Sequence, residues 1–220
     1  MSNLVTVVIH SYNRYEYLSN AIKSVLNQTM DDYEIILIND ESTDERYYKN
    51  NFGKKVKQID IRRNKNPRWT GSRQALINIG IENANGKYIA LLDDDDLWLE
   101  KKLELQIGEM ENNYYKFSST EGYFGLGKYS DKEQYPLYNT EHFAKVLKKK
   151  YRYTKYLKRG DLPKVWTEDF LKIHNCVIKS SAVIEKDTLQ MIGGFRGIPK
   201  MSDYDCWLSV IKVTDLLYIN

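Results

Sequence analysis

Short apolar runs alternate with amphipathic segments through the first half of the chain. Runs of β-branched and aliphatic residues predict strands at 4–9, 33–38, 56–61 and 88–92. Between them, apolar residues at three- and four-residue spacing predict helices at about 15–28 and 71–83, and the alternation places a further, less sharply marked helix near 45–52. Strands that alternate with helices in this way indicate a doubly wound parallel sheet with right-handed crossovers.

Polar residues follow each of these predicted strands. In a parallel sheet the carboxyl ends of the strands share one edge, and α/β proteins bind ligands in the crevice above that edge. We therefore expect four polar segments to meet in a single crevice. They are residues 10–14, 40–44, 62–73 and 93–96.

The fourth apolar run stops at four consecutive aspartates, Asp93 to Asp96. Such crowding of like charges is tolerated in water or beside a cation, and Mg²⁺ or Mn²⁺ suits carboxylate oxygens together with substrate phosphates. Alternation along an extended strand end predicts Asp93 and Asp95 on one side, with Asp94 and Asp96 on the other. The alternative is a solvated acidic loop in which Asp96 caps a helix that begins near Leu97.

The first predicted turn contains neither G-x-G-x-x-G nor G-x-x-x-x-G-K-[ST]. A dinucleotide site or a P-loop is therefore not indicated. Binding of phosphate at the crevice would instead depend on a metal and on arginines of the basic loop 62–73.

The second half is predicted less sharply. Apolar character suggests strands at 171–178 and 182–185, a short helix at 186–192, a tight glycine loop at 193–195 and a strand-like run at 216–220. A helix should begin near Tyr204. Cys176 and Cys206 lie far apart at no metal-binding spacing, and we interpret both as reduced, buried residues.

Length and composition bound the class of protein. The chain has 220 residues, 42% of them apolar and 29% charged, as expected for one globular domain. No signal peptide is indicated, and no run approaches the roughly 20 apolar residues that span a bilayer. We expect a soluble, cytoplasmic protein, with peripheral contact with a membrane left open.

Positive charge is concentrated in residues 144–160, which hold eight Lys or Arg, no acid and three interleaved tyrosines. The remaining residues carry 25 basic and 30 acidic side chains, a net charge of −5. The segment suits an anionic partner such as a lipid headgroup, a polyanionic acceptor or a nucleic acid. The alternative is a solvated helix face or a loop over an acceptor site.

Four segments of the first half resemble the family 2 glycosyltransferases of the GT-A fold, in the family's order and at its spacing. They are residues 5–14, 21–29, 34–44 and 86–96, and a fainter resemblance continues at 180–196 and 201–208. The resemblance implies a single GT-A (Rossmann-like) α/β domain with a mostly parallel central sheet flanked by helices. Residues 1–115 would form the nucleotide-sugar (donor) half, and residues 116–220 a smaller, mixed α/β acceptor half of the same domain.

The resemblance also implies roles for individual residues. Asp40 would hydrogen-bond the nucleobase, typically uracil. Asp93, Asp94 and Asp95 match the family's D-x-D motif; Asp95 would coordinate Mn²⁺ or Mg²⁺, and the other two would hold the nucleotide sugar. Asp203 matches the catalytic base of inverting members. The alternatives are that Asp40 only forms a turn and that Asp203 only caps a helix.

Five further residues are expected on the nucleotide-sugar side: His10, Tyr12, Asn13, Arg68 and Arg73. For the lone histidine, packing of the loop is the alternative, and for the two arginines it is a solvated basic loop.

The chain departs from the family at a few positions. His10 stands where many relatives carry Pro or Thr, and Asn39 where many carry Asp. Glu41 replaces a usual glycine, and Ser202 replaces a usual glutamate, which leaves Asp205 as a possible substitute base. Family members usually continue past residue 220 into a segment that often gives the metal a histidine.

The implied function is an inverting, metal-dependent transfer of a sugar from a UDP-sugar to a hydroxyl of a glycan, polysaccharide or glycoprotein. The alternative is a non-catalytic nucleotide-sugar-binding or scaffold domain. A nucleotidyltransferase shares this sheet but usually has a Gly-rich loop after the first strand, which is not found here. Nucleic-acid binding ranks last because no recognition motif accompanies the basic segment, and no nucleic-acid partner is expected.

Overall fold

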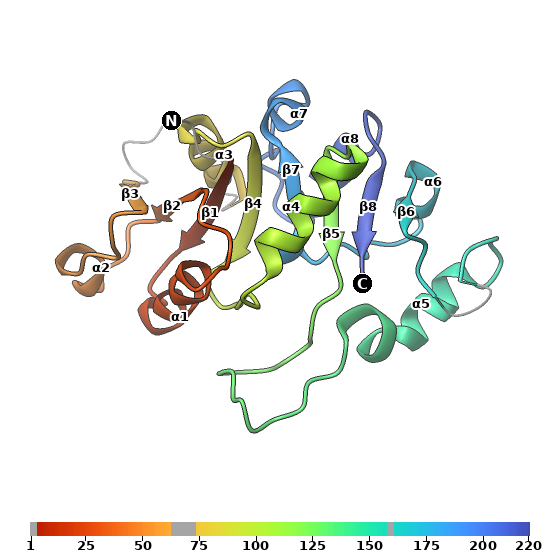
Figure 1. The fold of residues 1–220 in the computed structure, drawn as a ribbon, viewed down its shortest axis with the longest axis horizontal. Coiled ribbons are helices and arrows are strands. Elements are labelled where there is room, and N and C mark those ends of the chain that lie inside the picture. Colours follow the sequence, from red (N-terminus) through yellow and green to blue (C-terminus); the bar gives the residue numbers. More distant parts are fainter. Residues whose placement is uncertain (1–3, 63–73, 158–160) are drawn as a thin grey trace.

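The computed structural model describes residues 4–62, 74–157 and 161–220. Within these residues, eight strands form one sheet in the order β3-β2-β1-β4-β7-β5-β8-β6 (Figure 1). The strands are β1 Val5–Ser11, β2 Tyr33–Asn39, β3 Val56–Asp60, β4 Tyr88–Asp93, β5 Phe117–Thr120, β6 Val165–Trp166, β7 Val183–Glu185 and β8 Leu216–Ile219.

Helices cover both faces of this sheet. They are α1 Tyr15–Leu26, α2 Arg46–Lys49, α3 Gln74–Asn83, α4 Lys102–Asn113, α5 Ala144–Tyr151, α6 Glu168–Leu171, α7 Lys186–Met191 and α8 Ser202–Val210. A π-helical turn, η2 (Tyr138–His142), precedes α5, and a 3₁₀ turn, η3 (Lys179–Ser181), precedes β7. The fold is therefore the mostly parallel α/β sheet that the sequence predicts.

Strands β1 to β4 run parallel to one another, and successive residues along them point to opposite faces. On β1, Val7 and Ile9 pack with α1 and α4, whereas Val8 packs on the other face with α3. Figure 1 shows α1 and α4 in front of the sheet. Because both faces are buried, these strands consist of nearly continuous apolar residues.

The second half extends the same sheet with a change of direction. Strand β7 lies between β4 and β5 and is antiparallel to both, so β5 is parallel to β4. Strand β8 is parallel to β5. The carboxyl ends of β4, β5 and β8 therefore lie at one edge, together with those of β1 and β2.

The bounds predicted from the sequence are wrong for several helices. Helix α4 begins at Lys102, later than expected, because Trp98 is held outside a helix: its backbone N–H donates to Ser24 Oγ, and its indole N–H donates to the Ser180 carbonyl. Helix α1 ends at Leu26, short of the expected residue 28, and α2 is a single turn.

A strand was wrongly predicted at residues 171–178. Leu171 ends α6 and the residues after it form a loop, in which Cys176 and Val177 are buried side chains and not members of the sheet. The Asn139 amide donates to the carbonyl of Cys176 at 3.1 Å, so a side chain satisfies a backbone group that a neighbouring strand would otherwise satisfy.

The two halves are joined at the glycine turn before α8. Gly193 and Gly194 both have positive φ angles, of 79° and 69°. The Asn78 side chain on α3 donates to the Phe195 carbonyl and accepts from the Phe195 N–H, both at 2.8 Å. This pair of bonds fixes the turn, and Phe195 then packs edge-on against Trp207 of α8.

Candidate active site

The four aspartates form a turn at the carboxyl end of β4. The strand ends at Asp93, and the Asp96 N–H donates to the Asp93 carbonyl at 3.2 Å. This turn brings Asp93 and Asp96 to one side and Asp94 and Asp95 to the other, so the predicted alternation along an extended strand is wrong. Asp96 precedes no helix, and its expected role as a cap is wrong as well.

One pair of these carboxylates faces the loop after β1. Arg14 Nη1 donates to Asp94 Oδ1 at 3.3 Å and to Asp95 Oδ2 at 2.6 Å. Ser11 Oγ donates to Asp94 Oδ2 at 2.6 Å and also shares a hydrogen bond with the Tyr47 hydroxyl. Asp94 is only 7% exposed, and this burial raises its pKa, while Ser11 and Arg14 act in the opposite direction.

The other pair faces the turn η3 in the second half of the chain. Lys179 Nζ forms an ion pair with Asp93 Oδ1. Ser180 Oγ accepts from the Asp93 N–H at 3.0 Å and donates to Asp96 Oδ2. Two cations, one from each half of the chain, thus bracket the acidic turn.

Asp40 lies at the carboxyl end of β2, next to β1, and is fully buried. His10 Nε2 approaches Asp40 Oδ2 at 3.7 Å. His10 is also the neighbour of Asp93 in the register between β1 and β4. The structure therefore brings His10, Asp40 and the acidic turn together, as the topology predicts.

The loops after β1 and β2 are tied to each other. Asn13 Oδ1 accepts from the Thr43 N–H at 2.8 Å, so the Asn13 side chain is engaged in shaping this edge. Asn39 bridges the loop in the same way, donating to Asp60 Oδ1 and accepting from the Ser42 N–H. Glu41 adopts a left-handed φ of 59°, a backbone conformation that favours glycine.

The structure says less about the other three residues expected to bind the nucleotide sugar. Tyr12 is half-buried beside this edge. Arg68 and Arg73 lie outside the described residues.

Asp203 lies in the first turn of α8 and is half-buried. Met201 precedes the helix and no side chain caps it, so Asp203 is not a helix cap. Among the described residues, the Asp203 carboxylate has no hydrogen-bond or ion-pair partner. Asp205 differs: both of its oxygens accept from Arg196, with Nε at 2.7 Å from Oδ2. The substitute base considered from the sequence is therefore already engaged.

Tyr138 of η2 lies near both the acidic turn and Asp203. Its pKa is raised first by burial and then by the charges of Asp96 and Asp203, so both carboxylates lie near its hydroxyl. Its ring belongs to an aromatic cluster with Phe124 and Phe143. The acidic turn and Asp203 thus share one region of the strand-end edge.

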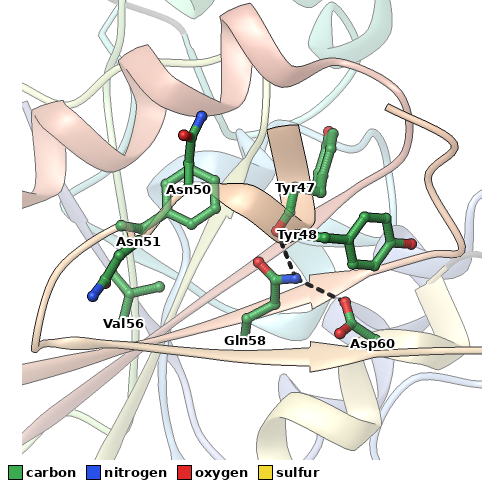
Figure 2. A pocket seen from close by; sticks show the side chains of 8 residues that line it. Tyr47, Tyr48, Asn50, Asn51, Val56, Gln58 and Asp60 are labelled. Carbon is green, nitrogen blue, oxygen red and sulfur yellow. Dashed lines mark hydrogen bonds between the residues drawn. The ribbon is translucent and has the colours of Figure 1, made fainter. Parts of the chain in front are cut away.

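A pocket of about 290 Å³ lies between α2 and β3 (Figure 2). Gln58 donates to the Tyr47 carbonyl and to Asp60, so polar groups line its floor. None of the four aspartates lines it. We assign the candidate site from the carboxylates, whose chemistry is specific, and not from this open depression.

A divalent cation such as Mn²⁺ or Mg²⁺ binds oxygen ligands, which the carboxylates of the acidic turn provide. Asp95 is exposed, and within the described part of the chain only its Oδ2 is engaged, by Arg14, so Asp95 fits a hard cation. Among the described residues, no three His, Cys, Asp or Glu side chains gather in an arrangement that would hold a metal alone. A cation at Asp95 would take its other ligands from water and from the phosphates of a substrate.

The model of the family described as Glycosyl transferase family 2 matches residues 6–183, which include the acidic turn and both loops that face it. The chain belongs to this family. Residues up to 115, which contain β1 to β4 and are called the β1–β4 half below, carry most of the matched segment, and the match ends at the first residue of β7.

Individual proteins that are similar in sequence to this chain are also named as glycosyltransferases. The chain is 30% identical over 221 residues to UDP-Glc:alpha-D-GlcNAc-diphosphoundecaprenol beta-1,3-glucosyltransferase WfgD of Escherichia coli, covering 99% of this chain and 73% of WfgD. It is 45% identical over 116 residues to an uncharacterized glycosyltransferase of Rickettsia bellii, covering 53% of this chain but only 16% of the relative. The matched part thus spans a small share of some curated relatives.

Solved structures show the same GT-A fold at low sequence identity. Staphylococcus aureus TarS 1-349 in complex with UDP-GlcNAc is 12% identical, with a TM-score of 0.63, over 98% of this chain and 58% of TarS. The mannosyltransferase PcManGT from Pyrobaculum calidifontis, in complex with GDP-Man and Mn²⁺, is 14% identical, with a TM-score of 0.67, over 99% of this chain and 55% of PcManGT. The expected fold is therefore confirmed.

Several residues of this candidate site could not be identified from the sequence. Lys179, Ser180 and Tyr138 reach it from the second half, and no local pattern distinguishes them. Arg14 was visible as the basic residue of the first polar loop, but its contact with Asp94 and Asp95 depends on the register of β1 and β4.

Proposed function

We propose that this chain is the catalytic domain of an inverting glycosyltransferase that moves a sugar from a UDP-sugar to an acceptor hydroxyl. One observation carries the proposal: Asp96 of the acidic turn and Asp203, which has no ion-pair partner among the described residues, both lie near the Tyr138 hydroxyl at the carboxyl edge of a GT-A sheet. A donor held at the turn would present its anomeric carbon toward Asp203.

Each side chain has a distinct role in this proposal. Asp40 and His10 bind the nucleobase, and Asp93 holds the ribose in an orientation set by Lys179. Asp95 holds the cation, Mn²⁺ or Mg²⁺, which when bound supplies neutralising charge for the departing diphosphate. Arg14 lies beside the same carboxylate and adds positive charge there.

Asp203 is the general base of the transfer. It takes the proton of the acceptor hydroxyl as that oxygen attacks the anomeric carbon from the face opposite the diphosphate. A single displacement of this kind inverts the anomeric configuration. Because the Asp203 carboxylate has no partner among the described residues, no bond within that part of the chain has to break before it accepts the proton.

The relatives support the choice of donor and metal. The names of WfgD and of the TarS complex contain UDP-Glc and UDP-GlcNAc, whereas that of the PcManGT complex contains GDP-Man and Mn²⁺. UDP-sugars therefore rank first as donors and GDP-sugars second. WfgD, by its name, uses a saccharide linked through diphosphate to a polyprenol, so lipid-linked saccharides join glycans, polysaccharides and glycoproteins among the candidate acceptors. A non-catalytic scaffold is not favoured by these relatives.

Calorimetric titration of a panel of UDP- and GDP-sugars, with and without Mn²⁺, tests the donor site. We expect one UDP-sugar to bind in a Mn²⁺-dependent way and Asp95→Ala to weaken that binding by at least about tenfold, which corresponds to about 1.4 kcal/mol. Asp187→Ala is the matched control, because Asp187 is an exposed aspartate of α7, after the β7 end that pairs with the start of β4. Equal binding by Asp95→Ala and the unmodified protein would refute the metal role of Asp95.

A further inference from the structure

Helix α5 and the residues after it carry a dense basic surface that the proposed transfer does not use. The basic face consists of six exposed side chains: Lys145, Lys148, Lys149, Lys150, Arg152 and Lys155. The opposite side of the helix is apolar, and Leu147 and Tyr151 are buried in the core. The helix is therefore firmly packed on the protein while its charges face outward.

These charges are not neutralised by the described part of the chain. None of the six forms an ion pair with a carboxylate of the described residues, whereas many other Lys and Arg side chains do, such as Lys87 with Glu111 and Lys172 with Glu168. The rest of the chain is net acidic. An isolated positive surface on an otherwise acidic protein is a feature that suits a polyanionic partner.

Apolar side chains accompany the basic face. Tyr153 is 85% exposed, with the Arg152 guanidinium over its ring at 4.3 Å, and Val146 of α5 is also exposed. Leu126 is 83% exposed on the loop 121–137, whose Phe124 contacts the ring of Phe143 just before α5. Exposed aliphatic side chains such as Val146 and Leu126 gain little from a dissolved polyanion, whereas aliphatic and tyrosine side chains both enter the interfacial region of a bilayer.

The position of this surface relates it to the candidate active site. The loop 121–137 begins after β5, at the same sheet edge as the acidic turn, and in Figure 1 the loop and α5 extend beyond the carboxyl ends of β5 and β8. The basic face of α5 and the candidate active site therefore lie toward the same end of the sheet. Among the described residues, no helix combines the length and apolar character needed to cross a bilayer.

We propose that the basic face of α5 docks the protein on a bilayer that contains anionic phospholipids. The lysines contact the headgroup phosphates, and Tyr153, Val146 and Leu126 lie in the interfacial region. The contact is mainly electrostatic because the apolar side of α5 is occupied by the core. Docked in this way, the edge with Asp203 faces the membrane surface. The docking itself does not require the proposed sugar transfer.

Vesicle sedimentation without any nucleotide sugar tests the docking. The probes are vesicles of phosphatidylcholine mixed with phosphatidylglycerol, vesicles of phosphatidylcholine alone, and dissolved heparin. We expect binding to the anionic vesicles only, weakened by added salt. Each basic residue near such a surface contributes about fivefold to partitioning, so the variant Lys148→Gln, Lys149→Gln, Arg152→Gln should lose on the order of 100-fold.

A matched variant removes the same charge elsewhere: Lys23→Gln, Lys54→Gln, Lys101→Gln, three exposed lysines of the β1–β4 half. It should bind vesicles nearly as the unmodified protein does. Equal losses in both variants would overturn the assignment to α5. Binding to heparin but not to vesicles would overturn the proposal in favour of a soluble polyanionic partner. No binding to either probe would show that the basic face of α5 binds no anionic partner of these kinds.

A second measurement does not depend on charge removal. Tyr153→Trp places an indole at an exposed position, whereas Trp98, Trp166 and Trp207 are buried. Quenching by brominated phospholipid that exceeds that of the unmodified protein is expected if Tyr153 lies at the bilayer. Absence of added quenching on bound vesicles would overturn this orientation. Because neither assay contains a donor, failure of docking and failure of the donor site are separate results.

Discussion

The charged groups of the two halves differ in what they contact. In the β1–β4 half, the carboxylates of the acidic turn are all engaged, by Arg14 and Ser11 on one side and by Lys179 and Ser180 on the other. In the second half, Asp203 and the basic face of α5 have no partner of opposite charge among the described residues.

This difference suggests different binding roles for the two halves of the chain. Paired groups are held in place before a ligand arrives, which lowers the ordering cost of binding. Unpaired charges at a half-buried or exposed position remain available for a substrate or a surface. We infer that the β1–β4 half is preorganised for its donor, while the second half exposes the groups that meet the acceptor and its surroundings.

The largest expected effect concerns Asp203. Asp203→Asn removes the proposed base but keeps the shape of the side chain, so turnover should fall by about 10²- to 10⁴-fold. Donor affinity and melting temperature should stay nearly unchanged, because the carboxylate has no partner to lose among the described residues. Release of UDP in the presence of acceptor measures turnover, and calorimetry measures donor binding.

Asp205→Asn is the control for this experiment. It breaks the pair with Arg196 two residues along the same helix and should cost a little stability with little change in turnover. If Asp205→Asn abolished turnover while Asp203→Asn preserved it, the assignment of the base would be reversed.

The link between the halves offers the next largest effect. A Cβ added at Gly194 would lie 2.4 Å from Asn78 Oδ1, and the residue has a positive φ, so Gly194→Ala should destabilise the fold by about 3 kcal/mol. Gly193→Ala has a similar φ but open space around the added Cβ, and should cost only about 1 kcal/mol. Denaturant unfolding measures both; equal costs would show that the contact with Asn78 contributes nothing.

The parallel half could be predicted because its information is local. Each buried strand is a run of β-branched or aliphatic residues, and each ends where polar residues begin. The topology rules then bring the strand ends together without knowledge of any contact. His10, Asp40 and the acidic turn were placed at one edge for this reason.

The second half could not be predicted in the same way. The position of β7 between β4 and β5 follows from no local signal, and Lys179 reaches Asp93 from 86 residues away. The buried residues around Cys176 have the apolar character of a strand, but their backbone is paired with side chains such as Asn139. The apolar character of these residues correctly predicted that they are buried, but it wrongly predicted that they form a strand.

A smaller effect tests whether paired carboxylates of the first half stabilise it. Glu34 is partly buried, which alone would raise its pKa, but hydrogen bonds from Asn85 and Thr6 lower it overall. Glu34→Gln should therefore cost about 1–2 kcal/mol at neutral pH. Since the native pKa is lowered, this stabilisation is present above the ordinary glutamate pKa of about 4.3 and is lost as pH falls through the native value.

Urea unfolding across this pH range measures the effect of Glu34. Glu111→Gln is the comparison, because Glu111 pairs with Lys87 in an exposed position and should contribute less than about 1 kcal/mol, with a dependence on salt. An acid limb of the stability curve that is equally steep in Glu34→Gln and the unmodified protein would rule out the proposed contribution of Glu34.

The smallest effect concerns strain in the loop after β2. Glu41 holds a φ of 59°, at a cost of about 1–2 kcal/mol for a residue with a Cβ, and Glu41→Gly removes it. Glycine also frees the unfolded chain, at a cost of about 0.4–1 kcal/mol, so the net gain should be about 0.5–1 kcal/mol, or roughly 1–4 °C in melting temperature. Tyr114→Gly, at φ 58° after α4, should gain as much. If the β1–β4 half is preorganised, only Glu41→Gly should also weaken donor binding, because it loosens the loop that carries Asp40; equal donor affinity in both variants would show that this loop is rigid without its strained residue.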